Sequence, residues 1–269
     1  MSEAVEKEKA VRALVKTAVQ SYANGFEARH LAEKGNPNGT INMKVHNPFI
    51  AALGPEIQYF SALVRSLDSS LGDMLEGLAI SIAELSYDVS REVAGYLSDG
   101  QTTKIARLLE EYKRRMKRPE VGDYALLIDR KRNSVRKVRH DSDYYLRDAE
   151  TGRHYLIELK IGGDLDNKKA RSEKEALLEQ YAILCNTLGS SANVSLRFAT
   201  AYNRFGEGQP WEQGRVRQYF APDELLIGRD FWNFICKLPN GYDIVLGEYT
   251  ANASVIIHAL DNVKAAYLG

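Results

Sequence analysis

Apolar residues recur every three to four positions through much of the first 118 residues, which is the period of an α-helix. A loop rich in helix breakers, Gly35 to Gly39, interrupts the pattern. Proline is tolerated at the first helical position, so Pro55 favours a new helix, and a Ser-x-x-Asp capping box at Ser70 and Asp73 favours another. We expect helices at residues 4–33, from 55, from 70 and at 102–118.

Beyond residue 119 the apolar pattern alternates with a period of two, which is typical of β-strands. The expected strands are 124–128, 143–147, 154–161, 194–201 and a short one within 215–220, and the expected helices are 168–187, 229–237 and 244–266. A helix that connects two strands favours a mixed sheet. The sequence therefore predicts an α/β fold, in which residues 1–118 form a helical N-terminal region packed on a core of residues 119–269, both as parts of one integrated domain.

Composition limits the class of protein. The two cysteines, Cys185 and Cys236, lie in apolar stretches without the spacing of a zinc site or a disulfide framework. The N-terminus is charged and no apolar run reaches the roughly 18 residues that span a bilayer. We expect a soluble, cytoplasmic protein without a membrane partner.

The charges are sorted along the chain although the net charge is zero. Between Lys113 and Arg139 eleven basic residues stand against three acidic ones, and between Asp141 and Asp166 seven acidic residues stand against three basic ones. An acidic pocket between basic segments suits a metal site that acts on a polyanion. A solvated, charged surface explains the charge pattern alone equally well.

The strongest chemical signal lies in a predicted hairpin. In the strand 154–161 the odd-numbered residues are apolar, whereas Glu158 and Lys160 share the opposite face. The segment 148–153 has the composition of a turn, and pairing its two end residues places Asp143 opposite Glu158 and Asp141 opposite Lys160.

Two carboxylates directly opposed on a hairpin repel each other unless a cation lies between them. We therefore expect Asp143 and Glu158 to hold Mg²⁺, with Mn²⁺ as a substitute, and Lys160 to orient the attacking water or neutralise the phosphate. An ordinary charged hairpin is the alternative interpretation.

Asp143, the hairpin and Glu158-Leu-Lys160 resemble the PD-(D/E)XK nuclease superfamily, with Ser142 in place of the nominal proline. Further segments resemble the TdeIII-like restriction enzymes, which cut GGNCC-type sites: residues 65–72, 158–163, 202–208 and 227–232. The resemblance implies a type II restriction endonuclease that acts as a homodimer on a short palindrome in double-stranded DNA. It further implies a 5′-phosphate product and a cognate DNA methyltransferase as functional partner.

Several residues are expected to support this chemistry. Glu76, beside small residues on its helix, is a candidate third acid, which the superfamily often supplies from an N-terminal helix; an exposed glutamate is an equally good interpretation. Basic residues after the catalytic strand are expected to contact phosphate, and a Gly-rich segment is expected to read bases, although an ordinary surface loop fits that segment almost as well. The first set is Lys168, Lys169, Arg171 and Lys174, and the second is Asn203, Arg204, Arg215 and Arg217.

Two other functions remain open from the sequence. A repair or recombination nuclease of the same fold would recognise DNA structure or ends instead of a sequence. A non-catalytic DNA-binding protein would keep the fold without the chemistry.

Overall fold

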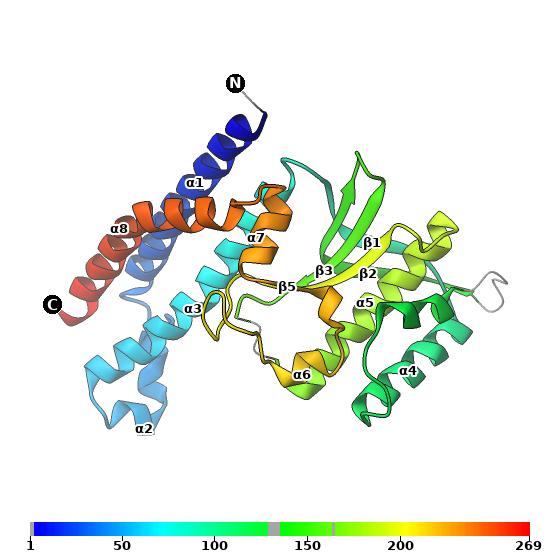
Figure 1. Cartoon of the computed structure of the whole chain (residues 1–269). Helices are drawn as coiled ribbons and strands as arrows, with labels where there is room; N and C mark the ends of the chain where they lie inside the picture. The colour runs from blue at the N-terminus through cyan, green and yellow to red at the C-terminus, as the bar shows by residue number, and fades with distance from the viewer. Residues whose placement is uncertain (1–2, 129–134, 163–164) are drawn as a thin grey trace. The chain divides into compact units, whose positions relative to one another are not determined.

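The computed structural model describes the chain except for residues 1–2, 129–134 and 163–164, and the side chains of residues 135 and 139–143 also lie outside the description. The chain divides into two compact units. The helical unit consists of Met1–Ser81 and Asp243–Gly269, and the sheet unit consists of Ile82–Tyr242 (Figure 1). Within the described ranges no helix has both the length and the apolar character to cross a membrane.

The helical unit is built from long amphipathic helices and a short connecting segment. Its elements are α1 (Glu3–Glu33), η1 (Asn42–His46), α2 (Pro48–Ala51), most of α3 (Pro55–Ala83) and most of α8 (Gly241–Leu268). Its core contains Phe26, Ile41, Tyr59, Ala62, Leu63 and Val263. Each of α1, α3 and α8 turns one apolar face toward this common core, which explains why apolar residues recur in these segments with the period of a helix. The predicted helix at residues 4–33 and the helix start at Pro55 are confirmed.

The predicted helix start at Ser70 is wrong, because α3 continues without a break through this position. The Ser70 hydroxyl donates to the Ser66 carbonyl at 2.7 Å, four residues back in the same helix. A serine can make this bond inside a helix as well as at its start, so Ser-x-x-Asp does not by itself mark a cap.

The sheet unit contains five described strands in the order β1-β2-β3-β4-β5. They are β1 (Asp88–Ser98), β2 (Val135–Asp148), β3 (Arg153–Leu159), β4 (Val194–Thr200) and β5 (Leu225–Ile227). Strand β2 pairs antiparallel with both β1 and β3, whereas β3 pairs parallel with β4 and β4 parallel with β5. Helix α5 (Asn167–Leu188) makes the crossover from β3 to β4 (Figure 1). The mixed α/β fold class with a helical N-terminal part is confirmed.

The predicted hairpin register is confirmed where the structure describes the pairing. Tyr144 faces Ile157 and Asp148 faces Arg153, as the turn composition indicates. Asp143 precedes Tyr144 in β2, but its side chain, like that of Asp141, lies outside the described residues. The expected opposition of Asp143 and Glu158 therefore remains a prediction.

Three short elements differ from the sequence-based expectation. Residues 124–128 belong to η2 (Val121–Leu127), a 3-10 helix, and residues 214–217 form α6, a single helical turn, instead of strands. Strand β1 falls in the region expected to be helical. A few alternating residues do not determine the conformation of such short segments, because tertiary packing outweighs their weak intrinsic preference.

Helices α4 (Asp99–Lys113) and α5 pack on one face of the sheet, where Leu156 of β3 joins their core. Aromatic side chains cover the opposite face: Tyr155 of β3 lies with its ring centre 4.9 Å from that of Phe234 in α7 (Arg229–Cys236). Strand β3 is consequently buried on both faces. A polar side chain on this strand must therefore be paired or serve a function.

Candidate active site

Glu158 is a buried acid near the end of the central strand. Strand β3 lies between β2 and β4, and Glu158 is level with Phe198 of β4. Only 10% of the Glu158 side chain is exposed. Because side chains alternate along a strand, Glu158 lies on the same face as Leu156, the face against which α5 packs.

Lys160 directly follows β3 and continues its path, since its backbone N–H donates to the Ala199 carbonyl at 3.0 Å. Its ammonium group forms an ion pair with Glu158 and lies 3.5 Å from Oε1 of Glu173 on α5. The prediction that Glu158 and Lys160 share a face is thus confirmed. Glu173 was not predicted as a residue near Lys160. Its position in the first turns of α5 could have indicated this, because a crossover helix packs back across the sheet.

The described residues include part of the donor set expected for Mg²⁺. Within the described ranges, no three His, Cys, Asp or Glu side chains form a group that could hold a metal ion. The buried Glu158 carboxylate is the hard oxygen donor that Mg²⁺ prefers, so its chemistry fits this ion. Glu76 lies half-buried on α3 of the helical unit, and its role as a third acid stays a prediction.

Two segments that follow β4 and β5 meet at the carboxyl ends of the parallel strands. The Gly228 N–H donates to the Thr200 carbonyl at 3.0 Å, and the Trp232 indole donates to the Ala201 carbonyl at 2.7 Å. A Cβ on Gly162 would lie 2.7 Å from the Tyr202 hydroxyl, so a side chain at this position would displace the Tyr202 ring. The structure therefore brings three of the four motif segments together beside Lys160, at the edge where open α/β sheets commonly bind ligands.

The predicted base-reading segment is an ordered loop followed by α6. The Asn203 amide group donates to the Gln209 carbonyl at 2.7 Å and accepts from the Phe205 N–H at 3.0 Å. Asn203 therefore shapes the loop. Arg204, Arg215 and Arg217 are exposed to solvent, and their contact with DNA stays a prediction.

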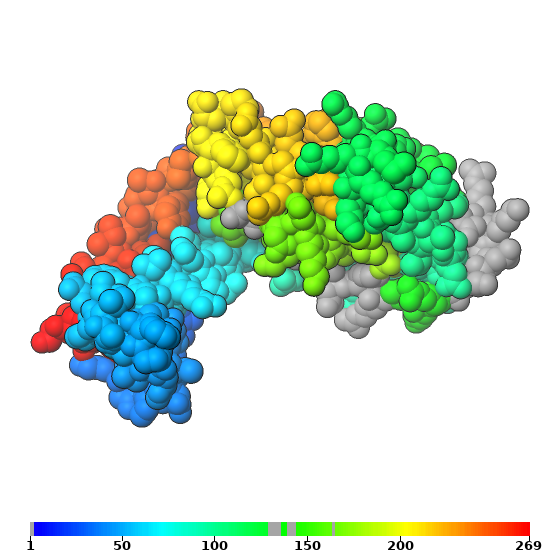
Figure 2. All heavy atoms as spheres, turned by 90° about the horizontal axis from the view of Figure 1, so that it is seen from below, coloured from blue at the N-terminus to red at the C-terminus, as the bar shows by residue number. Residues whose placement is uncertain are grey.

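A basic cavity of about 740 Å³ lies between the end of α4 and α6. Figure 2 shows the yellow and orange surface of residues 200–220 beside the green surface of α4, and Gln218 donates to the Lys113 carbonyl at 2.9 Å. Arg115, Lys117 and Arg118 line the cavity together with Arg217. The basic run predicted from the sequence and the proposed base-reading segment thus share one surface.

The first turn of α5 presents two exposed cations, Lys168 and Lys169. Asp166 caps this helix by accepting from the Lys169 N–H at 2.8 Å, and this bond lowers the pKa of the Asp166 carboxyl. Arg171 is half-buried, 3.8 Å from a Glu110 oxygen. Lys168 and Lys169 are therefore the residues of this turn best exposed to phosphate.

The structure corrects the expectation that Lys174 contacts DNA. Its side chain is fully buried, and its ammonium group donates to both carboxylate oxygens of Glu224, at 2.6 and 2.8 Å. The Tyr124 hydroxyl also accepts from it at 2.6 Å. Burial lowers the pKa of Lys174, and the charge of Glu224 opposes that shift. Lys174 has a structural role, because no surface is left for a phosphate to reach.

Comparison with known proteins places the chain in a family. Residues 7–251 match the family model described as "Type II restriction endonuclease, HinfI". Searches of curated proteins and of solved structures gave no significant match. This match confirms the prediction of a type II restriction endonuclease. It does not show the narrower resemblance to TdeIII-like enzymes. The chain belongs to the HinfI family of type II restriction endonucleases, enzymes that cut DNA at specific sites.

Proposed function

We propose that this enzyme cuts both strands of double-stranded DNA at a short palindrome, with Mg²⁺ held by Asp143 and Glu158 and with Lys160 beside it. The observation that carries the proposal is the buried Glu158 in an ion pair with Lys160 at the end of the central strand. Taking a carboxylate out of water costs free energy that an ion pair only partly offsets, so a buried acid at the ligand-binding edge of the sheet supports a functional role. The family match supports the DNA substrate.

The protein groups have separate tasks in this proposal. Bound Mg²⁺ would supply acidification of a coordinated water and charge stabilisation at the phosphate. Glu158, held by β3 between two neighbouring strands, is a fixed ligand. Lys160 lies close to both Glu158 and Glu173, so its ammonium group is positioned to donate to the attacking water or to a phosphate oxygen.

Recognition would divide between the α5 turn and the loop with α6. Lys168 and Lys169 are proposed to contact phosphate, whereas Arg204, Arg215 and Arg217 are proposed to reach bases in the major groove. The likeness to TdeIII-like enzymes predicts a GGNCC-type site and a cognate methyltransferase. Sequencing the cut ends tests that site directly.

A homodimer would match the two-fold symmetry of a palindrome. Exposed apolar side chains on the helical unit support this proposal. Seven large apolar side chains between residues 43 and 64 are exposed: Met43, Val45, Phe49, Leu53, Ile57, Phe60 and Val64. Phe49 is 84% exposed, and we propose that it packs against a second copy.

The test of catalysis compares wild type with Glu158→Gln and Lys160→Met on unmethylated phage DNA with Mg²⁺. We expect discrete fragments from wild type and cleavage reduced by at least about 100-fold in both variants, because each loses a group that acts at the reacting phosphate. Glu175→Gln, two residues from Glu173 on α5, is the matched control and should cut normally. Glu76→Gln in the same assay tests the third acid.

The outcomes separate the rival functions. A ladder without a fixed cut sequence would indicate a repair or recombination nuclease. Footprinting without cleavage, unaffected by Asp143→Ala, would indicate a non-catalytic binding protein. Cutting that survives both Glu158→Gln and Lys160→Met would refute the assigned site.

The dimer is tested by light scattering after size-exclusion chromatography. We expect wild type to have twice the mass of one chain and Phe49→Asp to have the mass of a monomer, because a buried unpaired charge destabilises an apolar interface. Leu188→Asp, at an exposed apolar residue of the sheet unit, is the control. A monomeric wild type, with or without duplex DNA, would contradict the proposal.

A further inference from the structure

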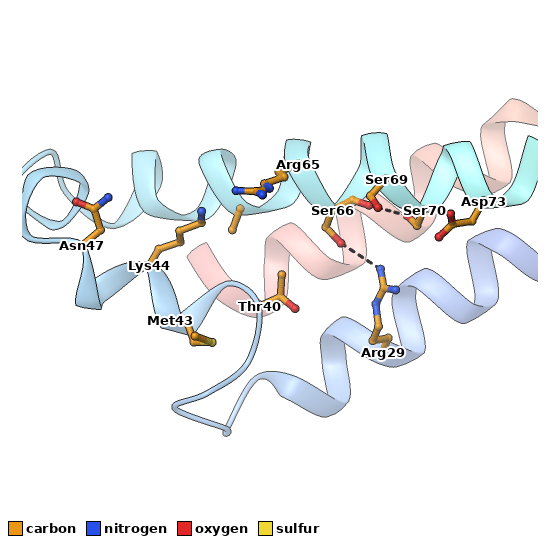
Figure 3. A pocket seen from close by; sticks show the side chains of 11 residues that line it. Arg29, Thr40, Met43, Lys44, Asn47, Arg65, Ser66, Ser69, Ser70 and Asp73 are labelled. Atoms are coloured by element: carbon orange, nitrogen blue, oxygen red, sulfur yellow. Dashed lines mark hydrogen bonds between the residues drawn. The ribbon is translucent and has the colours of Figure 1, made fainter. Parts of the chain in front are cut away.

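The helical unit contains a cavity of about 600 Å³ with basic and hydroxyl side chains on its walls. The walls come from α1, the segment around η1, and α3 (Figure 3). Its polar lining includes Arg29, Lys44 and Arg65 as cations and Ser66, Ser69 and Ser70 as hydroxyls. Four of these residues belong to the segment 65–72, which the proposed catalytic site does not use.

Protein acids offset only part of the positive charge of this cavity. Within the described part of the chain, neither Lys44 nor Arg65 forms an ion pair, and Arg29 donates to a hydroxyl instead of a carboxylate. Asp73 is the acid of the lining, and Figure 3 shows it at the end of the α3 row remote from Lys44. Glu33 accepts from the Thr40 N–H in the cavity wall and interacts electrostatically with Arg29. Three cations against these two acids still leave a surplus of positive charge that an anion would neutralise.

The hydroxyl groups are held in fixed positions. Nη2 of Arg29 donates to Oγ of Ser66 at 3.0 Å, and Nε2 of His30 lies 3.0 Å from the same atom. Burial lowers the pKa of His30, so this ring adds no positive charge near neutral pH. The Ser70 hydroxyl donates to the Ser66 carbonyl at 2.7 Å. The Ser70 proton is thus already donated, and phosphate oxygens only accept, so Ser70 shapes the cavity wall and the donors for an anion are the cations and the other hydroxyls.

The spacing on α3 places these groups on one helical face. Ser66, Ser69 and Ser70 are three and four residues apart, and Arg65 lies one turn before Ser69. In Figure 3 the Lys44 side chain extends from η1 toward α3 near Arg65, and Arg29 extends from α1 toward Ser66. The cations therefore approach the hydroxyl row from two sides.

We propose that this cavity binds a phosphate group of the DNA backbone and so forms a second DNA contact on the helical unit. Arginine, lysine and serine side chains supply most phosphate contacts in protein–DNA complexes, and the cavity lies within the range of about 300–1,000 Å³ that is usual for ligand sites. The inference rests on the proposed function in that the ligand is DNA. Phosphate contacts carry no sequence information, so this site contributes affinity and not specificity.

The test measures binding of a labelled duplex of arbitrary sequence, in EDTA to prevent cleavage, over a series of salt concentrations. We expect Arg65→Ala to weaken binding roughly tenfold, as removal of one charge-assisted hydrogen bond to phosphate should. The slope of log affinity against log salt should fall by about 0.9 for each phosphate that the variant no longer neutralises. Lys44→Gln is a second variant at the same cavity, and Lys16→Ala, an exposed lysine on α1 outside it, is the control with an unchanged slope.

Each outcome decides the proposal. The proposal is wrong if both Arg65→Ala and Lys44→Gln bind DNA with the wild-type affinity and salt slope while melting curves show that they are folded. It is also wrong if Lys16→Ala loses as much DNA affinity as they do. If inorganic phosphate or a mononucleotide protects wild type against thermal unfolding while the duplex slope is unchanged in the variants, the cavity binds a small anion and the proposal is wrong. Absence of cleavage by wild type would refute the proposed function and leave this binding result standing.

Discussion

The buried pair of Lys174 and Glu224 gives a sharp prediction about stability. Their side chains are 0% and 1% exposed. Removing one partner of a buried ion pair costs about 3–5 kcal/mol, because the other charge is left uncompensated. We therefore expect Lys174→Met to destabilise the sheet unit by this amount.

The geometry identifies what the substitution removes. Two of the hydrogen bonds that Glu224 accepts come from Lys174, and the Tyr124 hydroxyl and the Ala221 N–H, each at 2.7 Å, supply two others. The Lys174 ammonium group also lies over the rings of Tyr124 and Phe220, at 4.7 and 4.6 Å from their centres. Methionine has a similar length and keeps much of this packing. The expected loss is therefore mainly electrostatic.

A double-mutant cycle isolates the pairing energy. Glu224→Gln removes the charge but keeps an oxygen that can accept from the Ala221 N–H. In the presence of Lys174→Met it leaves no buried charge uncompensated. The double variant should thus lose at least about 2 kcal/mol less than the sum of the two single variants.

The assay is urea unfolding followed by tryptophan fluorescence. Both tryptophans of the chain, Trp211 and Trp232, lie in the sheet unit, so their fluorescence reports on that unit. With a slope of about 2 kcal/mol/M, the predicted loss lowers the urea midpoint by about 1.5–2.5 M. A loss below about 1 kcal/mol, or additive single effects, would refute the reasoning. So would a reduced DNA affinity of folded Lys174→Met, since this residue is inaccessible to phosphate.

Other predictions concern packing, pH and metal. Gly95→Ala should lower the free energy of unfolding by about 1–3 kcal/mol, because the new Cβ would lie 2.7 Å from Ile183 Cγ2. Gly77→Ala should instead raise it, because this position on α3 faces open space. Equal effects of the two substitutions in denaturation experiments would contradict this. Burial lowers the pKa of His154 below 6.5, so the unfolded chain binds the proton more readily and stability should fall as the pH drops through 6.5. The free energy of unfolding of His154→Gln should therefore change less over this pH range than that of wild type. If variant and wild type differ by the same free energy of unfolding at about pH 8 and about pH 5.5, the prediction is wrong. EDTA should abolish cleavage and Mg²⁺ restore it; cleavage in EDTA would exclude the metal.

The hairpin shows what local pattern can predict. The turn composition at 148–153 and the alternation along 154–161 predicted the observed pairing of Tyr144 with Ile157, because a one-residue slip would turn the whole apolar set to the wrong face. The shared face of Glu158 and Lys160 followed from the same alternation. Both results depend on residues close together in sequence.

The features that the sequence did not predict depend on residues that are far apart in the chain. Lys174 looks like its exposed neighbours Lys168 and Lys169, and its burial depends on Glu224, fifty residues later in the chain. Strand β5 has three residues, too few for any periodicity. The cavity beside Arg65 requires three separate segments to meet. Such features follow from the tertiary arrangement, and local propensity does not contain them.

The division of the chain into units has a consequence for its synthesis. The sheet unit is one continuous stretch, so it can begin to fold as soon as Tyr242 leaves the ribosome. The helical unit needs both ends of the chain, and its core includes Val263. The Asn262 amide also donates to Glu27 at 2.9 Å. A ribosome that stops near residue 243 would therefore release a chain whose β-sheet is whole but whose first helix lacks its partner α8.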